Sequence, residues 1–300
     1  MTKIRAFLSA LNKARKKNSP YVTRRRYDAL LDNFNLLKES ITSQPNPLST
    51  PARLKWEKEY QGKGRELCLF VSYTPKPKVK SYVAHYIQAL KNQGIDVILI
   101  LNTDFPELPI ENFEYNPNIS GLCIRENKGF DFGAWSQVMA QVNSTNFDRI
   151  YWVNDSLFGP LKINLFDAMI DRIKQSKSDL VGLTKNGAGE EHLQSFFLVF
   201  NKRLLENSIF WGYVTSLWSF PTKSLVIEFY ELRLTRFVKD LGFSYEALFS
   251  LKGRENQELM YYFPRELVES GFPFVKTALI KSKKDEGVSA EFLPQHLPIE

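Results

Sequence analysis

The stretch GLCIRENKGFDFGAWSQVMAQVNSTNFDRIYWVNDSLFGPL, residues 121–161, decides the fold. Apolar runs at 122–125 and 149–153 are typical of buried strands, and we expect a helix over 135–142 between them. Polar residues follow each run directly. Ligands of open α/β sheets bind at the carboxyl ends of the strands. The stretch therefore predicts the fold class and also where a functional site lies.

The segments on both sides continue the alternation of strands and helices. Gly94 is placed to end a helix in the left-handed conformation. The alternation predicts an α/β protein with a mostly parallel sheet, right-handed crossovers and flanking helices. The further expected strands are 67–71, 97–101, 179–183 and 196–200, and the expected helices are 81–93, 165–176 (capped by Asn164) and 224–241, with a last helix and short strand within 255–276.

Composition limits the class of protein. With 300 residues and 43% hydrophobic content, the chain can bury one full core. It has no uninterrupted apolar run of about 18 residues, and its N-terminus is too basic for a secretory signal, so we expect a cytoplasmic protein. Cys68 and Cys123 lie in apolar runs without C-x-x-C spacing, which favours buried thiols over a zinc site.

Charge separates the chain into two parts. Residues 1–65 hold 15 Lys or Arg and 5 Asp or Glu, a balance of +10, so the net charge of +7 leaves −3 for the remainder. We expect a basic helical arm and linker over 1–65, with a second helix over 24–40 and a proline-rich linker over 43–64. A first helix around Ile4, Phe7 and Leu11 either lies on an anionic membrane surface or packs on the body. Nucleic acid is not an expected partner, because no recognised binding module accompanies the charge.

Five motifs follow one another along the chain: RENKGFDFGAW at 125–135, NDS at 154–156 with GP at 159–160, HLQSFF at 192–197, YE at 230–231 and GFPFVK at 271–276. In this order they resemble the rhamnan synthesis F family over roughly residues 66–282. These bacterial glycosyltransferase-like proteins act in assembly of cell-wall and capsular polysaccharide. The resemblance implies a GT-A-type fold over 66–300 and transfer of a sugar, often rhamnose, from a nucleotide-diphospho-sugar to a growing glycan.

A sugar transferase must hold a nucleoside diphosphate and stabilise the charge on its leaving phosphates. The turn after the first run suits this task, because glycine lets backbone N–H groups approach a ligand and neighbouring polar side chains can bind ribose or phosphate. A purely structural strand-to-helix turn is the alternative. The expected donor-binding residues are Ser72, Tyr73, Arg125, Asn127, Lys128, Gly129, Asp131, Asn154 and Asp155.

Asp155 stands where GT-A enzymes carry a D-x-D-type metal site. Mg²⁺ or Mn²⁺ there would bridge the carboxylate and the diphosphate. This chain departs from the pattern, since Asn154 and Ser156 flank a single carboxylate. Phosphates can instead be neutralised by Lys128, Lys185 or Arg125. Simple turn chemistry is the remaining interpretation.

The candidate general base is Glu231, at the margin of the apolar arc of the 224–241 helix, where burial would raise its pKa. A rim glutamate paired with an arginine is the competing interpretation. Glu190, Glu191 and His192 are rivals for the base, and Gln194 and Ser195 are expected to contact the acceptor. The acceptor would be a glycan or lipid-linked glycan at the inner face of the plasma membrane. Two functions remain open: an inverting glycosyltransferase, and a catalytically silent module that binds glycan or partner proteins.

Overall fold

The computed structural model describes residues 48–111, 119–187, 191–254 and 257–281, together with 32–33, 35–37 and 39. The chain divides into two compact units, Met1–Leu48 and Ser49–Glu300. In the first unit the described residues between 32 and 39 are helical, as expected within 24–40. The expected helix around Ile4 lies outside the described residues.

The second unit is built on an eight-stranded sheet with the order β1-β4-β3-β2-β5-β10-β7-β11. Its four central strands, β4-β3-β2-β5, are parallel, whereas β1 and β10 run antiparallel to their neighbours. The α/β class is therefore confirmed, with a sheet that is mixed. In chain order the strands are β1 (Leu54–Lys58), β2 (Glu66–Tyr73), β3 (Asp96–Thr103), β4 (Gly121–Glu126), β5 (Arg149–Asn154), β7 (Leu180–Gly182), β10 (Phe197–Asn201) and β11 (Tyr245–Ala247).

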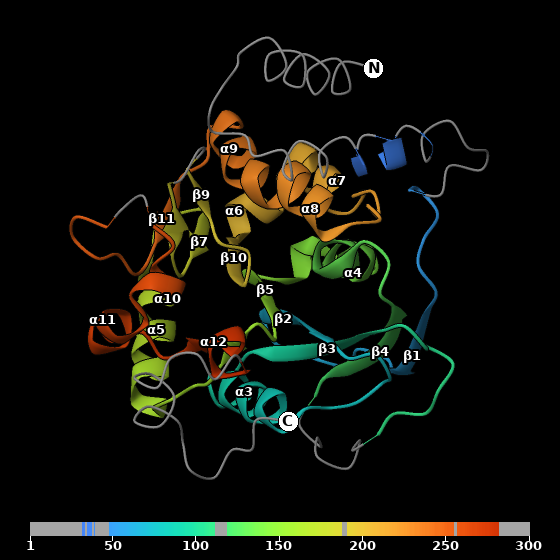
Figure 1. Cartoon of the computed structure of the whole chain (residues 1–300), viewed down its shortest axis with the longest axis horizontal. Helices are drawn as coiled ribbons and strands as arrows, with labels where there is room; N and C mark the ends of the chain where they lie inside the picture. The colour runs from blue at the N-terminus through green and yellow to red at the C-terminus, as the bar shows by residue number, and fades with distance from the viewer. Residues whose placement is uncertain are drawn as a thin grey trace. The chain divides into compact units, whose positions relative to one another are not determined.

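The chain changes winding direction at the centre of this sheet. From β2 it passes through α3 (Ser81–Asn92) to β3 and then β4, moving one way. It returns through α4 (Phe130–Met139) to β5, which lies on the other side of β2. Figure 1 shows α3 and α4 on opposite faces of the parallel strands. The carboxyl ends of β2 and β5 therefore form the topological switch point, where ligands of such sheets bind.

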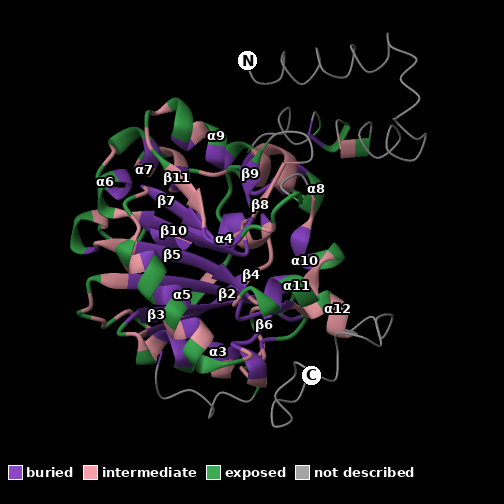
Figure 2. Ribbon diagram, turned by 90° about the vertical axis from the view of Figure 1, so that its left-hand side faces the viewer, coloured by how far each residue is buried: buried purple, intermediate pink, exposed green. Residues whose placement is uncertain are grey.

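Both faces of the sheet are covered, which explains the unbroken apolar runs of the strands. On one face, Phe70 and Val153 belong to a core cluster that includes Phe166 of α5 (Ile163–Gln175). On the other, Trp135 of α4 stacks on Trp152 of β5 with ring centroids 5.0 Å apart. Figure 2 shows the strands buried and the outer sides of the helices exposed. Both cysteines are buried free thiols, as predicted.

The remaining elements surround the sheet. A helical segment runs through α8, a π-helical turn and α9, and Gly242 follows it with φ +82°. Two short strand pairs join β6 to β12 and β8 to β9. The bounds are β6 (Leu157–Phe158), β8 (Lys185–Asn186), β9 (His192–Leu193), α6 (Lys202–Leu205), α7 (Ser208–Val214), α8 (Lys223–Val226), the π-turn (Ile227–Glu231), α9 (Leu232–Asp240), α10 (Leu259–Tyr262), α11 (Pro264–Glu269), β12 (Val275–Lys276), α12 (Thr277–Lys281) and a 3₁₀ turn (Ser144–Asn146).

Three local predictions are wrong. Part of the expected linker, Leu54–Lys58, is the edge strand β1, because Leu54 and Trp56 alternate with charged residues and lie half-buried beside β4. Helix α4 begins at Phe130 instead of 135, since Gly129 turns the chain at φ +75° and the helix follows at once. Asn164 does not cap α5, which already includes it.

No helix in the described part of the chain is long and apolar enough to cross a lipid bilayer.

Candidate functional site

Asp155 follows the last residue of β5 and is held from the neighbouring strand β2. Its Oδ2 accepts hydrogen bonds from Ser72 Oγ at 2.7 Å and from the Tyr73 N–H at 3.1 Å. The same oxygen forms an ion pair with Lys80, whose side chain, like that of Asp155, is largely buried. Lys80 also donates to the Tyr73 carbonyl at 2.7 Å. Asp155 thus ties the two strand ends that flank the switch point.

Asn154 connects β5 to α4 through Asp131. Its Nδ2 donates to Asp131 Oδ2 at 2.8 Å, while its Oδ1 accepts from the Ser156 N–H and hydroxyl at 3.1 and 2.6 Å. Burial, reinforced by the charges of Asp155 and Glu231, raises the pKa of Asp131 to about 6. A carboxyl group that titrates near neutrality beside other carboxylates marks a functional-site candidate.

The glycine-containing turn after β4 lies on the same edge of the sheet. Asn102, the buried residue near the end of β3, donates at 3.3 Å to both Asn127 Oδ1 and the Phe130 carbonyl. Gly129 is needed sterically as well as conformationally, because a Cβ there would meet Ser219 Cα at 2.8 Å. Phe130 also has a positive φ, 55°, which is rare for a residue with a side chain.

We call Ser72, Asn102, Asn127, Asp131, Asn154 and Asp155 the strand-end cluster. The structure places its members at the carboxyl ends of β2, β3, β4 and β5, as the expected strand bounds predicted, except for Asp131, which lies at the start of α4 instead of in the turn before it. Within the cluster, Asn102 donates a hydrogen bond to Asn127, and Asn154 donates one to Asp131. Asp155 is the next residue after Asn154 in the chain.

Two of the expected donor-binding side chains point elsewhere. Arg125 is completely buried and donates to Gln137 Oε1 at 2.8 Å and to the Glu126 and Lys128 carbonyls at 2.8 and 2.6 Å. Its burial lowers its pKa to about 10. The Lys128 ammonium donates to the Thr50 carbonyl at 2.9 Å. Both side chains therefore brace the turn from the protein side.

Glu231 approaches the cluster from the π-helical turn. Its Oε1 accepts a hydrogen bond from the Ser195 N–H, just before β10, at 3.4 Å. Glu231 is close enough to Asp131 to help raise the pKa of that carboxyl group. A π-helical turn is uncommon and is frequently found at functional sites. Glu231 and Ser195 are thus brought together, as a base and an acceptor contact would be.

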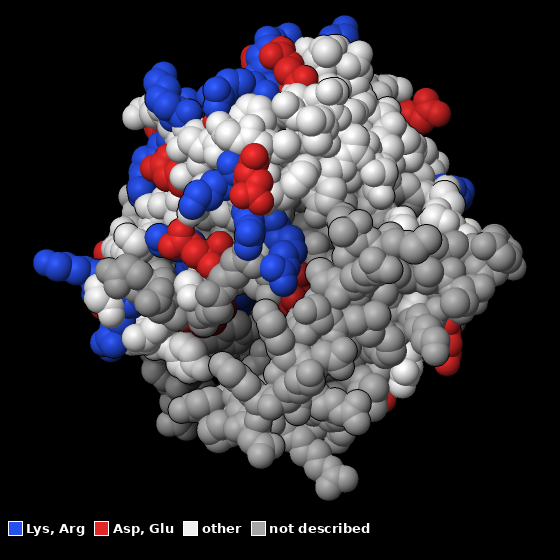
Figure 3. Space-filling model, turned by 90° about the horizontal axis from the view of Figure 1, so that it is seen from above, with Lys and Arg blue, Asp and Glu red and all other residues white. Residues whose placement is uncertain are grey.

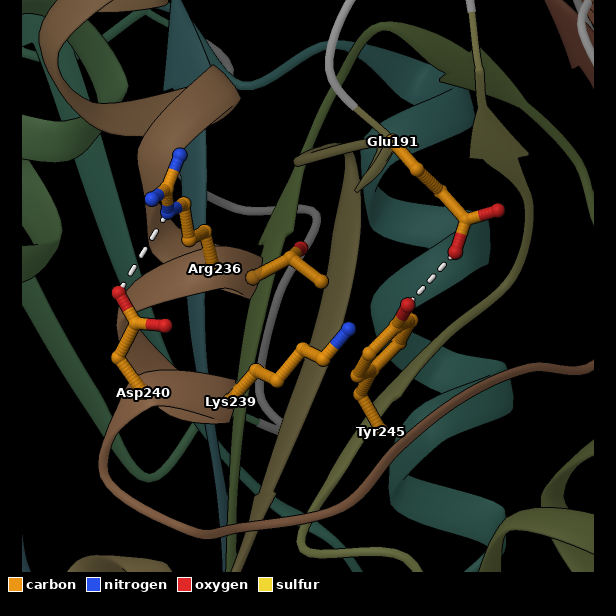
Figure 4. A pocket seen from close by; sticks show the side chains of 6 residues that line it. Glu191, Arg236, Lys239, Asp240 and Tyr245 are labelled. Atoms are coloured by element: carbon orange, nitrogen blue, oxygen red, sulfur yellow. Dashed lines mark hydrogen bonds and ion pairs between the residues drawn. The ribbon is translucent and has the colours of Figure 1, made fainter.

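Glu191 belongs to a different place. It lines a cavity of about 380 Å³ with Thr235, Arg236, Lys239, Asp240 and Tyr245. Its carboxylate accepts from Lys185 Nζ at 2.7 Å and Tyr245 OH at 2.6 Å, contacts that lower its pKa. Figure 4 shows Glu191 reaching toward Tyr245, across the cavity from α9. Lys239, which faces it, lies eight residues beyond Glu231, about 12 Å along a helix.

The remaining candidates for the general base and for the acceptor contact lie in different surroundings. His192 is buried on β9, and Gln194 is buried with its Nε2 donating to Glu258 Oε1 at 2.5 Å. Gln194 Oε1 accepts from Thr184 Oγ1 at 2.6 Å, so its amide is engaged within the protein. Glu190 lies outside the described residues.

The donor set around Asp155 fits a divalent metal poorly. Three donors already converge on its Oδ2, and one of them is the Lys80 ammonium, which would repel a cation. Within the part of the chain that the structure describes, no group of three or more His, Cys, Asp or Glu side chains is arranged to hold a metal ion.

Sequence reasoning missed Lys80 and Asn102. Asn102 carried a signal, because an asparagine that ends an otherwise apolar strand needs hydrogen-bond partners when buried. For Lys80 the sequence held no such indication, because its contact with Asp155 arises from the pairing of β2 with β5, which are far apart in the sequence.

The surface over α9 carries charges of both signs. Arg233 pairs with Glu228 at 2.9 Å and Arg236 with Asp240 at 3.5 Å. Figure 3 shows Lys and Arg intermixed with Asp and Glu on the described part of this face.

The chain is similar to two bacterial proteins over about two thirds of its length. An uncharacterized protein of Sinorhizobium fredii, y4gN, is 25% identical over 209 residues, covering 65% of this chain and 52% of its own. The virulence protein VirA of Vibrio anguillarum is 27% identical over 215 residues, covering 64% of this chain and 66% of its own. The chain thus spans about half the length of the first relative and about two thirds of the second.

The profile of rhamnan synthesis protein F matches residues 97–296, which include the glycine-containing turn, Asp155 and Glu231. This match covers 200 of the 300 residues. The chain therefore belongs to the rhamnan synthesis protein F family, a family of polysaccharide synthesis.

Proposed function

We propose that the protein is an inverting glycosyltransferase with a GT-A-type fold, which moves a sugar from a nucleotide-diphospho-sugar to a growing cell-surface polysaccharide. The observation that carries the proposal is the convergence of Asp131, Asn154 and Asp155 at the switch point, with Glu231 within electrostatic reach. Membership of a family of polysaccharide synthesis supports sugar transfer, and the family description makes rhamnose the first sugar to test.

The chemistry assigns different tasks to the two sides of the site. The strand-end cluster holds the nucleotide and diphosphate with its amide and hydroxyl groups. Glu231 takes the proton from an acceptor hydroxyl, whose oxygen attacks the anomeric carbon of the donor. The bond from that carbon to the phosphate oxygen breaks, and the leaving nucleoside diphosphate keeps the electron pair. The site must therefore stabilise negative charge where the diphosphate departs.

The acceptor in this proposal is a glycan or lipid-linked glycan at the inner face of the plasma membrane. The uneven charge of the chain supports this location, because residues 1–65 carry +10. A basic segment is attracted to anionic lipid by roughly 1 kcal/mol for each Lys or Arg near the surface.

A second function is favoured by the ion pair between Asp155 and Lys80. An Asp that is neutralised within the protein has less capacity to bind a metal–diphosphate complex. The alternative is therefore a catalytically silent module that binds glycan or partner proteins of a polysaccharide assembly complex.

Nucleotide binding tests the proposal most directly. A thermal-shift screen of nucleoside diphosphates and nucleotide sugars should show stabilisation by at least one of them, because a ligand that binds only the folded state stabilises it by mass action. Asp155→Ala should weaken that ligand at least about tenfold, because it removes the carboxylate that holds Ser72, Tyr73 and Lys80 at the strand ends. Calorimetry below the unfolding transition of each variant measures this loss.

The matched control is Asp148→Ala. Asp148 directly precedes the first residue of β5, at the opposite end of the strand from Asp155, and forms an exposed ion pair with Arg65. This substitution should leave the affinity unchanged. Equal affinities in both variants would contradict the role of Asp155. The absence of any stabilising nucleotide in the unmodified protein would favour the silent module.

A further inference from the structure

Lys276 is brought to the strand-end cluster by the small β6/β12 ladder. Lys276 pairs with Leu157, two residues after Asp155. The next residue, Thr277, fixes this position, since its N–H and its hydroxyl donate to the Ser156 carbonyl at 2.9 and 3.1 Å. The tail motif at 271–276 thus ends beside the turn that carries Asn154 and Asp155.

The side chain of Lys276 lies between aromatic rings. Its ammonium is 4.8 Å from the ring centre of Phe196 and 5.8 Å from that of Tyr261. Phe196 is buried and immediately precedes β10, next to Ser195. This burial lowers the pKa of Lys276, because desolvation disfavours its charged form. A lysine that served only as a surface charge would not be placed in such a setting.

The carboxylates near Lys276 are occupied with other groups. Glu258 accepts from Gln194 Nε2 at 2.5 Å and from Asn186 Nδ2 at 3.1 Å, and Glu231 accepts from the Ser195 N–H. Both are close enough to influence the pKa of Lys276, as is Asp131. Yet no carboxylate among the described residues forms an ion pair with its ammonium within 4.0 Å. Within the described part of the chain, this half-buried cation therefore has no direct anionic partner.

Lys223, the first residue of α8, is a second cation that acts electrostatically on the same group of side chains. It influences the pKa values of both Asp131 and Lys276. Lys223 is exposed, and it too forms no ion pair with a carboxylate of the described chain. Both lysines are therefore within electrostatic reach of Asp131 of the strand-end cluster.

We propose that Lys276, supported by Lys223, binds the diphosphate of the donor and stabilises the negative charge that the leaving diphosphate acquires. The inference rests on the proposed function for the identity of the anion. It gives the GFPFVK tail a role in the site. Lys276 of β12 supplies the positive charge that a metal ion would supply in a D-x-D-type site, which Asp155 does not form. Lys80 is already neutralised by Asp155, so it is not the cation that meets the phosphates.

Inorganic pyrophosphate is the probe, because it carries the proposed anion without a base or sugar. Calorimetry of the full chain, with Mg²⁺ and separately with EDTA, should detect binding in both buffers. Lys276→Met should weaken pyrophosphate and the best nucleoside diphosphate about tenfold to a hundredfold, the scale of a hydrogen bond to a charged group. The affinity for the matching nucleoside should remain unchanged.

Two further variants guard against a folding defect. Lys276→Arg keeps the charge and should retain most of the affinity, while Lys252→Met removes an exposed lysine from a loop and should behave as the unmodified protein. If Lys276→Met does not fold, Lys276→Arg compared with Lys276→Gln decides the same question. Equal affinities for pyrophosphate in the unmodified protein and in a charge-removing variant would overturn the inference.

The experiment separates this inference from the proposed function. Lysine-dependent pyrophosphate binding without turnover of any nucleotide sugar would support the anion site and count against transfer. Turnover that survives the loss of Lys276 without a change in diphosphate affinity would support transfer and overturn the role of Lys276. A protein that binds neither pyrophosphate nor any nucleoside diphosphate would overturn both.

Discussion

Glu231 and Glu191 both lie at the helical segment that runs from α8 to α9, but their hydrogen-bond partners differ. Glu231 receives one long hydrogen bond from a backbone N–H, near Asp131. Glu191 is fixed by Lys185 and Tyr245, which lower its pKa and so its basicity. Of the two, only Glu231 has the proximity to the strand-end cluster that a general base requires.

We therefore expect Glu231→Gln to lower turnover by roughly 10²–10⁴-fold, the usual effect of losing a general base. Donor affinity should hardly change, because the amide keeps the size of the side chain. Glu191→Gln is the matched control and should have near-normal turnover. An acceptor assay with single-donor calorimetry measures both quantities. A normal rate in Glu231→Gln, with a loss in Glu191→Gln, would transfer the role of base to the second cavity.

Asp131 and Asp179 give opposite pH dependences of stability. The pKa of Asp131 is raised to about 6 in the folded protein, so this carboxyl group loses its proton at a lower pH in the unfolded chain than in the folded one. The free energy of unfolding therefore falls as the pH rises from about 4 to 6. The pKa of Asp179 is lowered, chiefly by its hydrogen bonds from Arg203, so its contribution is present at neutral pH and is lost as acid protonates the folded state.

Asp131→Asn should therefore raise the free energy of unfolding above pH 6, by about 1–3 kcal/mol, with little effect at pH 4. The asparagine oxygen can still accept the hydrogen bond from Asn154. Asp179→Asn should lower stability at neutral pH, and the difference should shrink as the pH falls. Urea unfolding between pH 4 and 8 measures both curves. A constant offset across that range for Asp131→Asn would show that the change acts through packing instead of ionisation.

At the scale of elements, the turn into α4 combines backbone conformation with close approach. Gly129 and Gly94 have nearly the same φ, +75° and +76°, but only Gly129 faces another segment, at Ser219. Comparing the two glycines separates the two effects, because a Cβ at Gly94 would meet nothing within 4 Å.

Gly94→Ala should lower the free energy of unfolding by about 1 kcal/mol through the left-handed backbone alone. Gly129→Ala should cost at least about 1 kcal/mol more, since the methyl group meets backbone. It should also weaken nucleotide binding, because Asn127 and Asp131 flank the turn. Chemical denaturation and calorimetry measure these effects. Equal losses of stability in the two variants would mean that the approach to Ser219 relaxes without strain.

The sequence was sufficient for the elements whose signal is local. The central strands and α3 lie where apolar runs and helical periodicity predicted them, and the polar residues at strand ends lie together at one edge of the sheet, as expected. Strand direction is not a local property, so the reversal of β10 and the short β6/β12 ladder could not be predicted. The position of Lys276 depends on the β6/β12 ladder, and the contact of Lys80 with Asp155 depends on the pairing of β2 with β5, so neither could be predicted from the sequence.

At the scale of the molecule, the boundary between arm and domain has a functional consequence. Residues 50–53 hold the turn after β4: the carbonyls of Thr50, Ala52 and Arg53 accept from Lys128, Gln137 and the Glu126 N–H at 2.9, 2.8 and 2.9 Å. Residues 1–48 hold 10 Lys or Arg and 3 Asp or Glu, so 10 − 3 = +7 equals the whole net charge. The arm and the clamp on the turn are therefore separable.

A protein that begins at residue 49 should keep the melting temperature and nucleotide affinity of the full chain, yet float less with anionic liposomes at low salt. A protein that begins at residue 66 loses β1 and the clamp, and should melt earlier and bind nucleotide more weakly. Differential scanning calorimetry, calorimetric titration and flotation compare the two. Identical melting of both truncated proteins would contradict the contribution of β1, and undiminished flotation would contradict the role of the arm.

The position of β1 also dictates an order of events during synthesis. β1 leaves the ribosome first, but its partner β4 is complete only at Glu126, 68 residues after Lys58. At about 5–20 residues per second, the segment waits roughly 3 to 14 seconds for that partner. During this interval Lys55 and Glu57, the exposed charges that alternate with Leu54 and Trp56, discourage pairing with a neighbouring nascent chain. The strand that directly follows residues 50–53 is thus also the last of the first four to pair, and its alternating charges keep it unpaired until then.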